Sequence, residues 1–140
     1  MPAELYTPRS ANAALPYVRR VVEDLVRDHA GWRDAVAALA AADAAGTNAG
    51  TNADALRRRA DDLAADVRAA LADLAAIGVE CKGIDVGLVD FPAVVDGAPA
   101  YLCWQLGEPE VAWWHRRDAG FAGRRPLAAA FTEVGNEAGV

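Results

Sequence analysis

Residues 87–110 read GLVDFPAVVDGAPAYLCWQLGEPE, and this stretch decides the fold of the second half of the chain. Val, Phe, Tyr and Trp recur here in short runs bounded by turn residues, a pattern typical of β-strands. Asp96-Gly97 is a strong hairpin signal, because a type I′ turn needs positive φ at both central positions. The stretch predicts strands near 86–95 and 98–106, a longer turn at 107–110 and a third strand near 111–115, joined as an antiparallel meander.

The two predicted turns also set which side chains share a face of the sheet. If both turns close symmetrically, one face is the core, and it carries Val89, Phe91, Leu102, Trp104, Trp113 and His115. The opposite face then places Asp90 across from Cys103, with Trp114 beside them, because cross-strand neighbours lie roughly 5 Å apart. A shift of one residue would exchange these faces.

The first half of the chain has the spacing of long helices. Thr7-Pro8 starts a helix well, since Thr can cap free backbone N–H groups and Pro suits the first helical position. Pro16 lacks an N–H group, so residues 8–15 form either a short separate helix or the kinked start of a long one. The larger residues then alternate in steps of three and four, at Leu15, Val18, Val22, Leu25, His29, Trp32, Val36 and Leu39.

A second helix repeats this pattern, at Leu56, Ala60, Leu63, Val67, Ala70, Leu74 and Ile77. The small polar run GTNAGTNA separates the two helices and cannot bury apolar area, so we expect a mobile loop over residues 44–53. The pattern predicts an antiparallel helical hairpin over residues 8–77. Each helix would be about 35–40 Å long, more than a small β unit can cover. We therefore expect a homodimer in which two hairpins form a four-helix bundle.

Length and composition indicate one α+β domain over residues 1–140. The chain is 54% hydrophobic, enough for one core, and the hairpin is followed by a β unit at 78–116 and a Gly/Arg loop with an irregular tail at 117–140.

The net charge is −6 and acidic residues outnumber basic ones in both halves, which argues against nucleic-acid binding. No apolar run could span a membrane and no signal peptide is evident, so we expect a cytoplasmic protein. Its two cysteines, Cys81 and Cys103, are expected to be free thiols.

Several motifs resemble those of one known family. GLVDFP at 87–92, YLCWQLGEPE at 101–110, WWH at 113–115 and DAGFAGR at 118–124 resemble the domain of unknown function (DUF) 2203 family, an uncharacterised prokaryotic family. Thr7 and NAALP at 12–16 resemble the opening pattern of that family. The resemblance covers nearly the whole chain up to Leu127, with a variable loop at 40–54. It implies no activity, so functional inference depends on the residues themselves.

Asp90 and His115 are the first candidates for chemistry. Asp90 interrupts an apolar strand, where Asp is disfavoured, so it is either a metal ligand or general base, or a carboxylate satisfied by the backbone or an Arg. His115 ends the third strand, with Glu108 before it and Asp118 after it. With Asp90 and Cys103, these side chains offer imidazole, carboxylate and thiolate ligands for a divalent metal such as zinc. We expect Asp90, Glu108 and His115 to be metal ligands or catalytic groups; the alternative is a structural histidine, since no recognised metal motif is present.

The Gly/Arg loop is the best candidate for anion recognition. Glycine lets backbone N–H groups approach a ligand, and Arg binds carboxylate or phosphate in a bidentate fashion. Arg124 and Asp118, with Trp104 and Trp114 as aromatic walls, are the expected binding residues for a small anion. The alternative is that Arg124 only pins the loop to a carboxylate such as Glu108.

Two functions follow from these alternatives. A nucleophilic Cys–His pair is not expected, because Cys103 and His115 are predicted on opposite faces. The sequence has no GxSxG, P-loop or GxGxxG motif, which argues against the common hydrolase and nucleotide-binding classes. We therefore expect a small-molecule or metal-binding protein, an enzyme or not, with its site on the β unit. The alternative is a non-catalytic module that dimerises through the helical hairpin.

Overall fold

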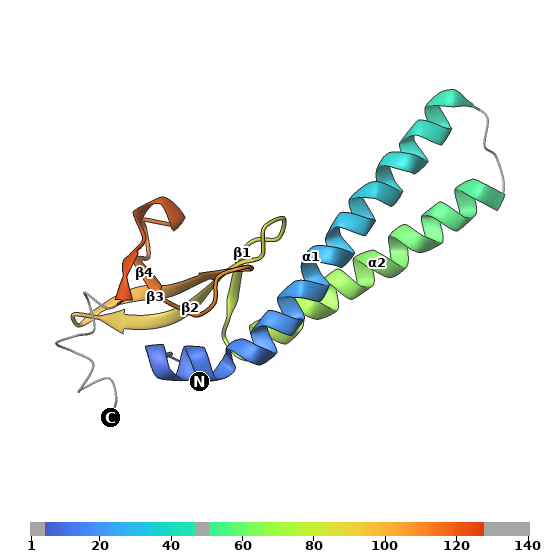
Figure 1. Ribbon diagram of the computed structural model, residues 1–140. Coiled ribbons are helices and arrows are strands. Elements are labelled where there is room, and N and C mark those ends of the chain that lie inside the picture. The colour runs from blue at the N-terminus through green and yellow to red at the C-terminus, as the bar shows by residue number, and fades with distance from the viewer. Residues whose placement is uncertain (1–4, 47–50, 128–140) are drawn as a thin grey trace.

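The computed structural model describes residues 5–46 and 51–127, and its two long helices precede a five-stranded antiparallel sheet (Figure 1). The predicted α+β class is confirmed. Helix α1 covers Pro8–Ala45 and helix α2 covers Thr51–Ala76, so both extend into the loop predicted at 44–53, whose central residues lie outside the described ranges. The far end of the helical hairpin projects beyond the sheet. Among the described residues, neither helix carries an apolar stretch of the length that a bilayer requires.

Both ends of α1 follow from local sequence. The Thr7 hydroxyl accepts from the Ser10 N–H at 3.1 Å, and the Ser10 hydroxyl accepts from the Thr7 N–H at 2.9 Å, which is a reciprocal capping box. Gly46 closes the helix in the left-handed conformation, with φ of +64°. The helix continues through Pro16, and its first turns bend away from the axis of the rest (Figure 1). The kinked start, and not a separate short helix, is therefore observed.

The two helices meet through small side chains where they project beyond the sheet. A Cβ added to Gly31 would lie 3.2 Å from Leu63 Cδ1, so α1 and α2 approach closely there. Among the side chains that the structure describes in this projecting part, the buried ones are alanines: Ala35, Ala42, Ala53 and Ala60. Val36, predicted to lie in the seam, is 40% exposed. The large residues of α1 are buried in its first half instead, because that half packs on the sheet.

The sheet is a meander whose strands follow chain order. Its strands are β1 Glu80–Gly83, β2 Leu88–Val95, β3 Ala98–Gln105, β4 Trp113–Arg116 and β5 Arg125–Pro126. The β2–β3 turn has φ of 54° at Asp96 and 75° at Gly97, as a type I′ turn requires. The predicted opposition of Asp90 and Cys103 is confirmed. The short strands β1 and β5 were not predicted, because their four and two residues are too few for a recognisable strand pattern.

One face of the sheet and the first half of α1 form the core. The residues that fill it and are at most 3% exposed include Leu15, Val18, Val22, Leu25, Val89, Phe91, Leu102 and Trp104. Tyr6 closes one end, with its ring edge on Phe91 at a centroid distance of 5.1 Å. The Tyr6 N–H also donates to the Pro92 carbonyl at 2.7 Å, which holds the segment before α1 on β2.

The pairing of β4 differs from the prediction by one residue. His115 was predicted opposite Leu102 on the core face, but its partner is Tyr101. Trp114 takes the place opposite Leu102 and enters the core, where it is 4% exposed. Because side chains alternate along a strand, this shift places His115 on the same face as Asp90.

The connection between β3 and β4 explains the shift. It is not a symmetric turn, because α1 holds it from the side: the Val111 N–H donates to Asn12 Oδ1 at 2.8 Å, and Asn12 Nδ2 donates to the Val111 carbonyl at 3.1 Å. At its start, the Leu106 N–H donates to the Gly87 carbonyl at 3.0 Å. Contacts with residues distant in sequence therefore set where β4 begins.

Gly87 provides a test of how closely α1 packs on the sheet. A Cβ there would lie 2.8 Å from both Val22 Cγ1 and Leu106 Cβ, whereas a Cβ on Gly97 would meet nothing within 4 Å. Both glycines have positive φ, so Ala costs about 1–2 kcal/mol of backbone strain at either site. We expect Gly87→Ala to lose roughly 1–3 kcal/mol more than Gly97→Ala in urea unfolding, because it also overpacks the core. Equal losses would contradict the close packing.

Candidate metal centre

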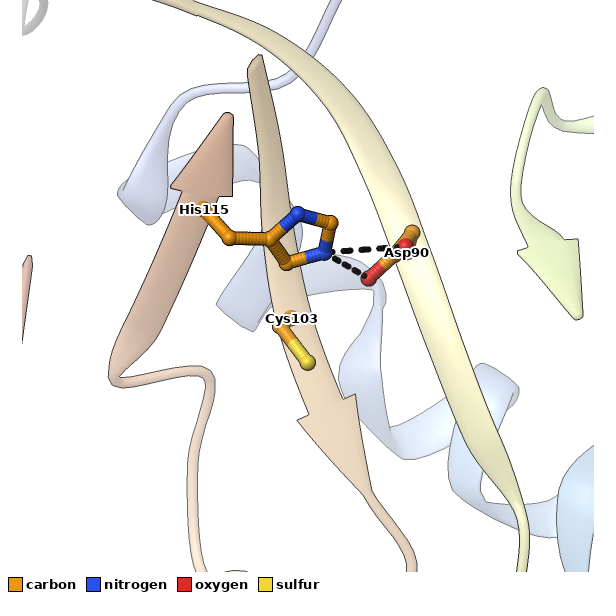
Figure 2. A group of neighbouring side chains, drawn as sticks. All are labelled: Asp90, Cys103 and His115. Carbon is orange, nitrogen blue, oxygen red and sulfur yellow. Dashed lines mark hydrogen bonds and ion pairs between the residues drawn. The ribbon is translucent and has the colours of Figure 1, made fainter. Parts of the chain in front are cut away.

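Three neighbouring strands bring together Asp90, Cys103 and His115 on the face of the sheet opposite the core (Figure 2). Asp90 lies on β2, Cys103 on β3 and His115 on β4. All three side chains are buried, with exposures of 2%, 0% and 3%. Their candidate ligand atoms all lie within 4.8 Å of one another. The group forms a compact set of carboxylate, thiol and imidazole that can hold a metal ion.

The hydrogen bonds of His115 leave a lone pair facing the Asp90 carboxylate. Nδ1 lies 2.6 Å from the Arg116 carbonyl oxygen, which can only accept, so we assign the ring proton to Nδ1. In the neutral ring, Nε2 then has no proton, yet it lies 3.1 Å from each Asp90 carboxylate oxygen. Two acceptors cannot bond to each other. A cation, either a proton or a metal ion, is required between them.

Burial controls the protonation of the other two groups. It raises the pKa of Asp90, and the opposing effect of His115 is smaller. Burial, together with the neighbouring Asp90 charge, raises the pKa of the Cys103 thiol to about 12. Cys103 is therefore a protonated thiol near neutral pH. Cys103 and His115 were predicted on opposite faces, which was wrong, because both residues share a face. The high pKa of Cys103 nevertheless makes the metal-free thiol a poor nucleophile.

Tyr101 covers the group from the side of β1. Its ring lies 5.5 Å from the His115 ring, and its hydroxyl lies 3.1 Å and 3.0 Å from the two carboxylate oxygens of Glu80. Lys82 Nζ lies 3.2 Å from Glu80 Oε1 and 4.5 Å from the centre of the Tyr101 ring. These contacts join the buried group to charged residues at the surface, and no spacing pattern in the sequence identifies them.

Glu108, expected to be a ligand, does not belong to the group. Its Oε1 accepts from the Gln105 N–H at 2.8 Å, its Oε2 pairs with Arg124 Nη2, and its backbone carbonyl accepts from Trp104 Nε1 at 3.0 Å. These contacts fix the β3–β4 connection. The alternative in which Arg124 pins a loop to Glu108 is therefore observed.

The other expected binding residues also lie apart from the group. Trp104 and Trp114 belong to the core, at 0% and 4% exposure. Asp118 is exposed in the turn after β4. Cys103 takes the place that the prediction gave to Glu108, because strand pairing places its side chain beside that of Asp90. Cys81 and Cys103 are both free thiols, as expected.

The raised pKa of Asp90 predicts how the stability of the metal-free protein, measured in the presence of a chelator, depends on pH. The folded protein binds this proton more tightly than the unfolded chain, so the free energy of unfolding falls as pH rises from 3.8 through the raised pKa. Asp90→Asn removes the titration and keeps an N–H donor for His115 Nε2. We expect urea unfolding between about pH 4 and pH 7 to show a flatter profile for this variant than for the wild type. The exposed Asp118→Asn variant should keep the wild-type slope; an unchanged slope in Asp90→Asn would contradict the assignment.

Comparison with known proteins identifies a family and no characterised relative. Searches against curated proteins and against solved structures found no match. The model of DUF2203, described as an uncharacterized conserved protein, matches residues 4–127. That range includes both helices, all five strands and the Asp90, Cys103 and His115 group, and the chain belongs to the DUF2203 family.

Proposed function

We propose that this protein binds a divalent transition-metal ion, with zinc as the first choice, through Asp90, Cys103 and His115. The observation that carries the proposal is the position of His115 Nε2, which lies 3.1 Å from each Asp90 carboxylate oxygen while Nδ1 contacts the Arg116 carbonyl. A metal ion placed among the three side chains would accept both lone pairs. It would also offset the cost of burying the Asp90 charge.

The donor set suits zinc. Zinc binds imidazole, thiolate and carboxylate, and a centre with three protein ligands keeps a fourth position for water or another ligand. The hydrogen bond from His115 Nδ1 to the Arg116 carbonyl supports the same function. Metal-binding histidines usually donate their second ring N–H to such an acceptor, which fixes the ring orientation.

Metal binding would change the charge state of Cys103. With its pKa raised to about 12 by burial, the thiol must release its proton to become a ligand. Metal affinity should therefore increase with pH. The positive charge of the bound ion would stabilise the buried thiolate, as expected for a cation beside a coordinating sulfur.

Titration with Co²⁺ tests the proposal, because a cobalt–thiolate bond gives near-ultraviolet absorption that identifies sulfur ligation. We expect one equivalent of Co²⁺ to produce this absorption in the wild-type protein. Cys103→Ser should abolish it, and Asp90→Asn should weaken Co²⁺ binding by more than about tenfold. Bound metal should also raise the melting temperature of the wild type, since it binds only the folded state.

Cys81→Ser is the matched control for sulfur ligation. Cys81 is the other cysteine, but strand alternation places it on the core face and outside the group. This variant should retain the wild-type absorption. Loss of the cobalt–thiolate absorption in Cys81→Ser, or its absence in the wild type with a full equivalent of Co²⁺, would contradict the proposal.

Self-association through the hairpin is the second candidate function. It is favoured by the apolar surface of the projecting half, where Val36 is 40% exposed. A groove of about 240 Å³ lies beside it, lined by His29, Trp32, Ala64, Val67 and Arg68. A second copy of the chain would cover this surface with the same residues, as in a two-fold symmetric dimer.

Sedimentation velocity at micromolar concentration tests this candidate. We expect a dimer for the wild type and a monomer for Val36→Glu, because the new charge would be buried in the interface. Circular dichroism should show equal helix content in both proteins. Ala38→Glu, at another exposed position of α1, is the control that should remain dimeric. A monomeric wild type would exclude the dimer.

A further inference from the structure

A contact between Tyr101 and Glu80 crosses the sheet beside the buried group. The Tyr101 hydroxyl, on β3, donates to the two carboxylate oxygens of Glu80, on β1, at 3.1 Å and 3.0 Å. Strand β2 lies between them, and its residue Asp90 is the direct strand partner of Glu80. The Tyr101–Glu80 bridge therefore spans β2 at Asp90, on the face that carries the three candidate ligands.

The Tyr101 ring closes the group on that side. Tyr101 is the strand partner of His115, and the centres of the two rings lie 5.5 Å apart. Lys82 Nζ lies 4.5 Å from the centre of the Tyr101 ring, and the guanidinium carbon of Arg117 lies 5.1 Å from it. Cations from β1 and from the turn after β4 thus hold the ring, which is 6% exposed.

Trp113 closes the group on the side of β4, where it is the strand partner of Cys103. The guanidinium of Arg124 lies 4.6 Å from the centre of the Trp113 ring. Arg124 is itself 10% exposed and pairs with Glu108, which also accepts from the Gln105 N–H. A buried ion pair therefore supports this side, whereas the Tyr101–Glu80 bridge depends on an exposed carboxylate.

Strand β1 is the part of the cover that can open at the lowest cost. It has four residues, lies at the edge of the sheet, and among the described strands pairs only with β2. Short edge elements with exposed side chains open locally at a lower free energy than the core. Because the three ligands are nearly inaccessible in the closed structure, an ion needs such an opening as its entry path.

We infer that the Tyr101–Glu80 bridge controls access to the buried group, and that its release lets a metal ion enter and leave. The inference rests on the proposed metal site and adds the regulation of that site. Release breaks the contact between hydroxyl and carboxylate but leaves the three ligands on their strands. The bridge therefore sets the rates of metal exchange and not the affinity for the ion.

Modification of Cys103 tests the bridge without any metal. In a Cys81→Ser background Cys103 is the only thiol, and its reaction with methyl methanethiosulfonate in a chelator can be followed by mass spectrometry. We expect slow modification of this parent protein. Tyr101→Phe, which keeps the ring and removes the hydroxyl, should react about tenfold faster or more. Glu80→Ala, at an exposed position, should do the same and decides the question if Tyr101→Phe does not fold.

Tyr6→Phe is the matched control. It also removes a tyrosine hydroxyl that donates a hydrogen bond, here to the Ile77 carbonyl, but Tyr6 belongs to the core on the other face. This variant should keep the slow modification of the parent. Equal acceleration in Tyr6→Phe would show that the thiol reacts through global unfolding and would overturn the inference. A parent thiol that reacts as fast as in urea, unchanged rates in Glu80→Ala, or a larger acceleration in Arg124→Gln would also overturn it.

Stopped-flow mixing with Co²⁺ tests the role of the bridge in metal exchange. We expect Tyr101→Phe to raise the association and dissociation rates by similar factors, about tenfold, with an unchanged Kd. Absence of the cobalt–thiolate absorption in every protein would overturn the metal site, while thiol modification still decides whether the bridge closes the group. Normal absorption with equal exchange rates in Tyr101→Phe and the wild type would overturn the control of access alone.

Discussion

The buried carboxylate of Asp90 is the constraint on which the arrangement of the sheet depends. Val89 and Phe91 on either side of it are fully buried in the core. Strand alternation therefore turns Asp90 to the opposite face. That face is also covered, so the carboxylate is 2% exposed and needs a positive charge beside it. His115 is the residue that can hold that charge, either as a proton or as a metal ion between the two side chains.

The helices contribute to this arrangement from a distance. The first half of α1 supplies the apolar surface that buries β2 and β3, and Asn12 near its start holds Val111 through two hydrogen bonds. This contact determines where β4 begins and so which face receives His115. In the described part of the chain, the far half of the hairpin projects beyond the sheet, and an alanine-rich seam joins α1 to α2 there. The structure thus combines a buried site on the sheet with a projecting helical arm (Figure 1).

The sequence predicted the parts of this structure that depend on local patterns. Asp96-Gly97 and the alternating residues around it are sufficient to place β2, β3 and the opposition of Asp90 and Cys103. The position of His115 was wrong by one residue, because the β3–β4 connection is held by Asn12, which lies 99 residues before Val111. Cys103 was correctly predicted opposite Asp90, but the sequence did not show that His115 would share their face. The hairpin was predicted, but residue size alone did not show that Ala35 and Ala42 would form the seam while Val36 faced outward.

The central claim is that a metal ion, and not only a proton, lies between Asp90, Cys103 and His115. An anomalous difference map at the zinc absorption edge, from crystals grown with zinc, tests it most directly. The account predicts one peak about 2.3 Å from Cys103 Sγ and about 2.0 Å from His115 Nε2, with an Asp90 oxygen at a similar distance. A map with no peak among these three side chains, in crystals where zinc is seen elsewhere, would contradict it and leave a proton as the only bridge.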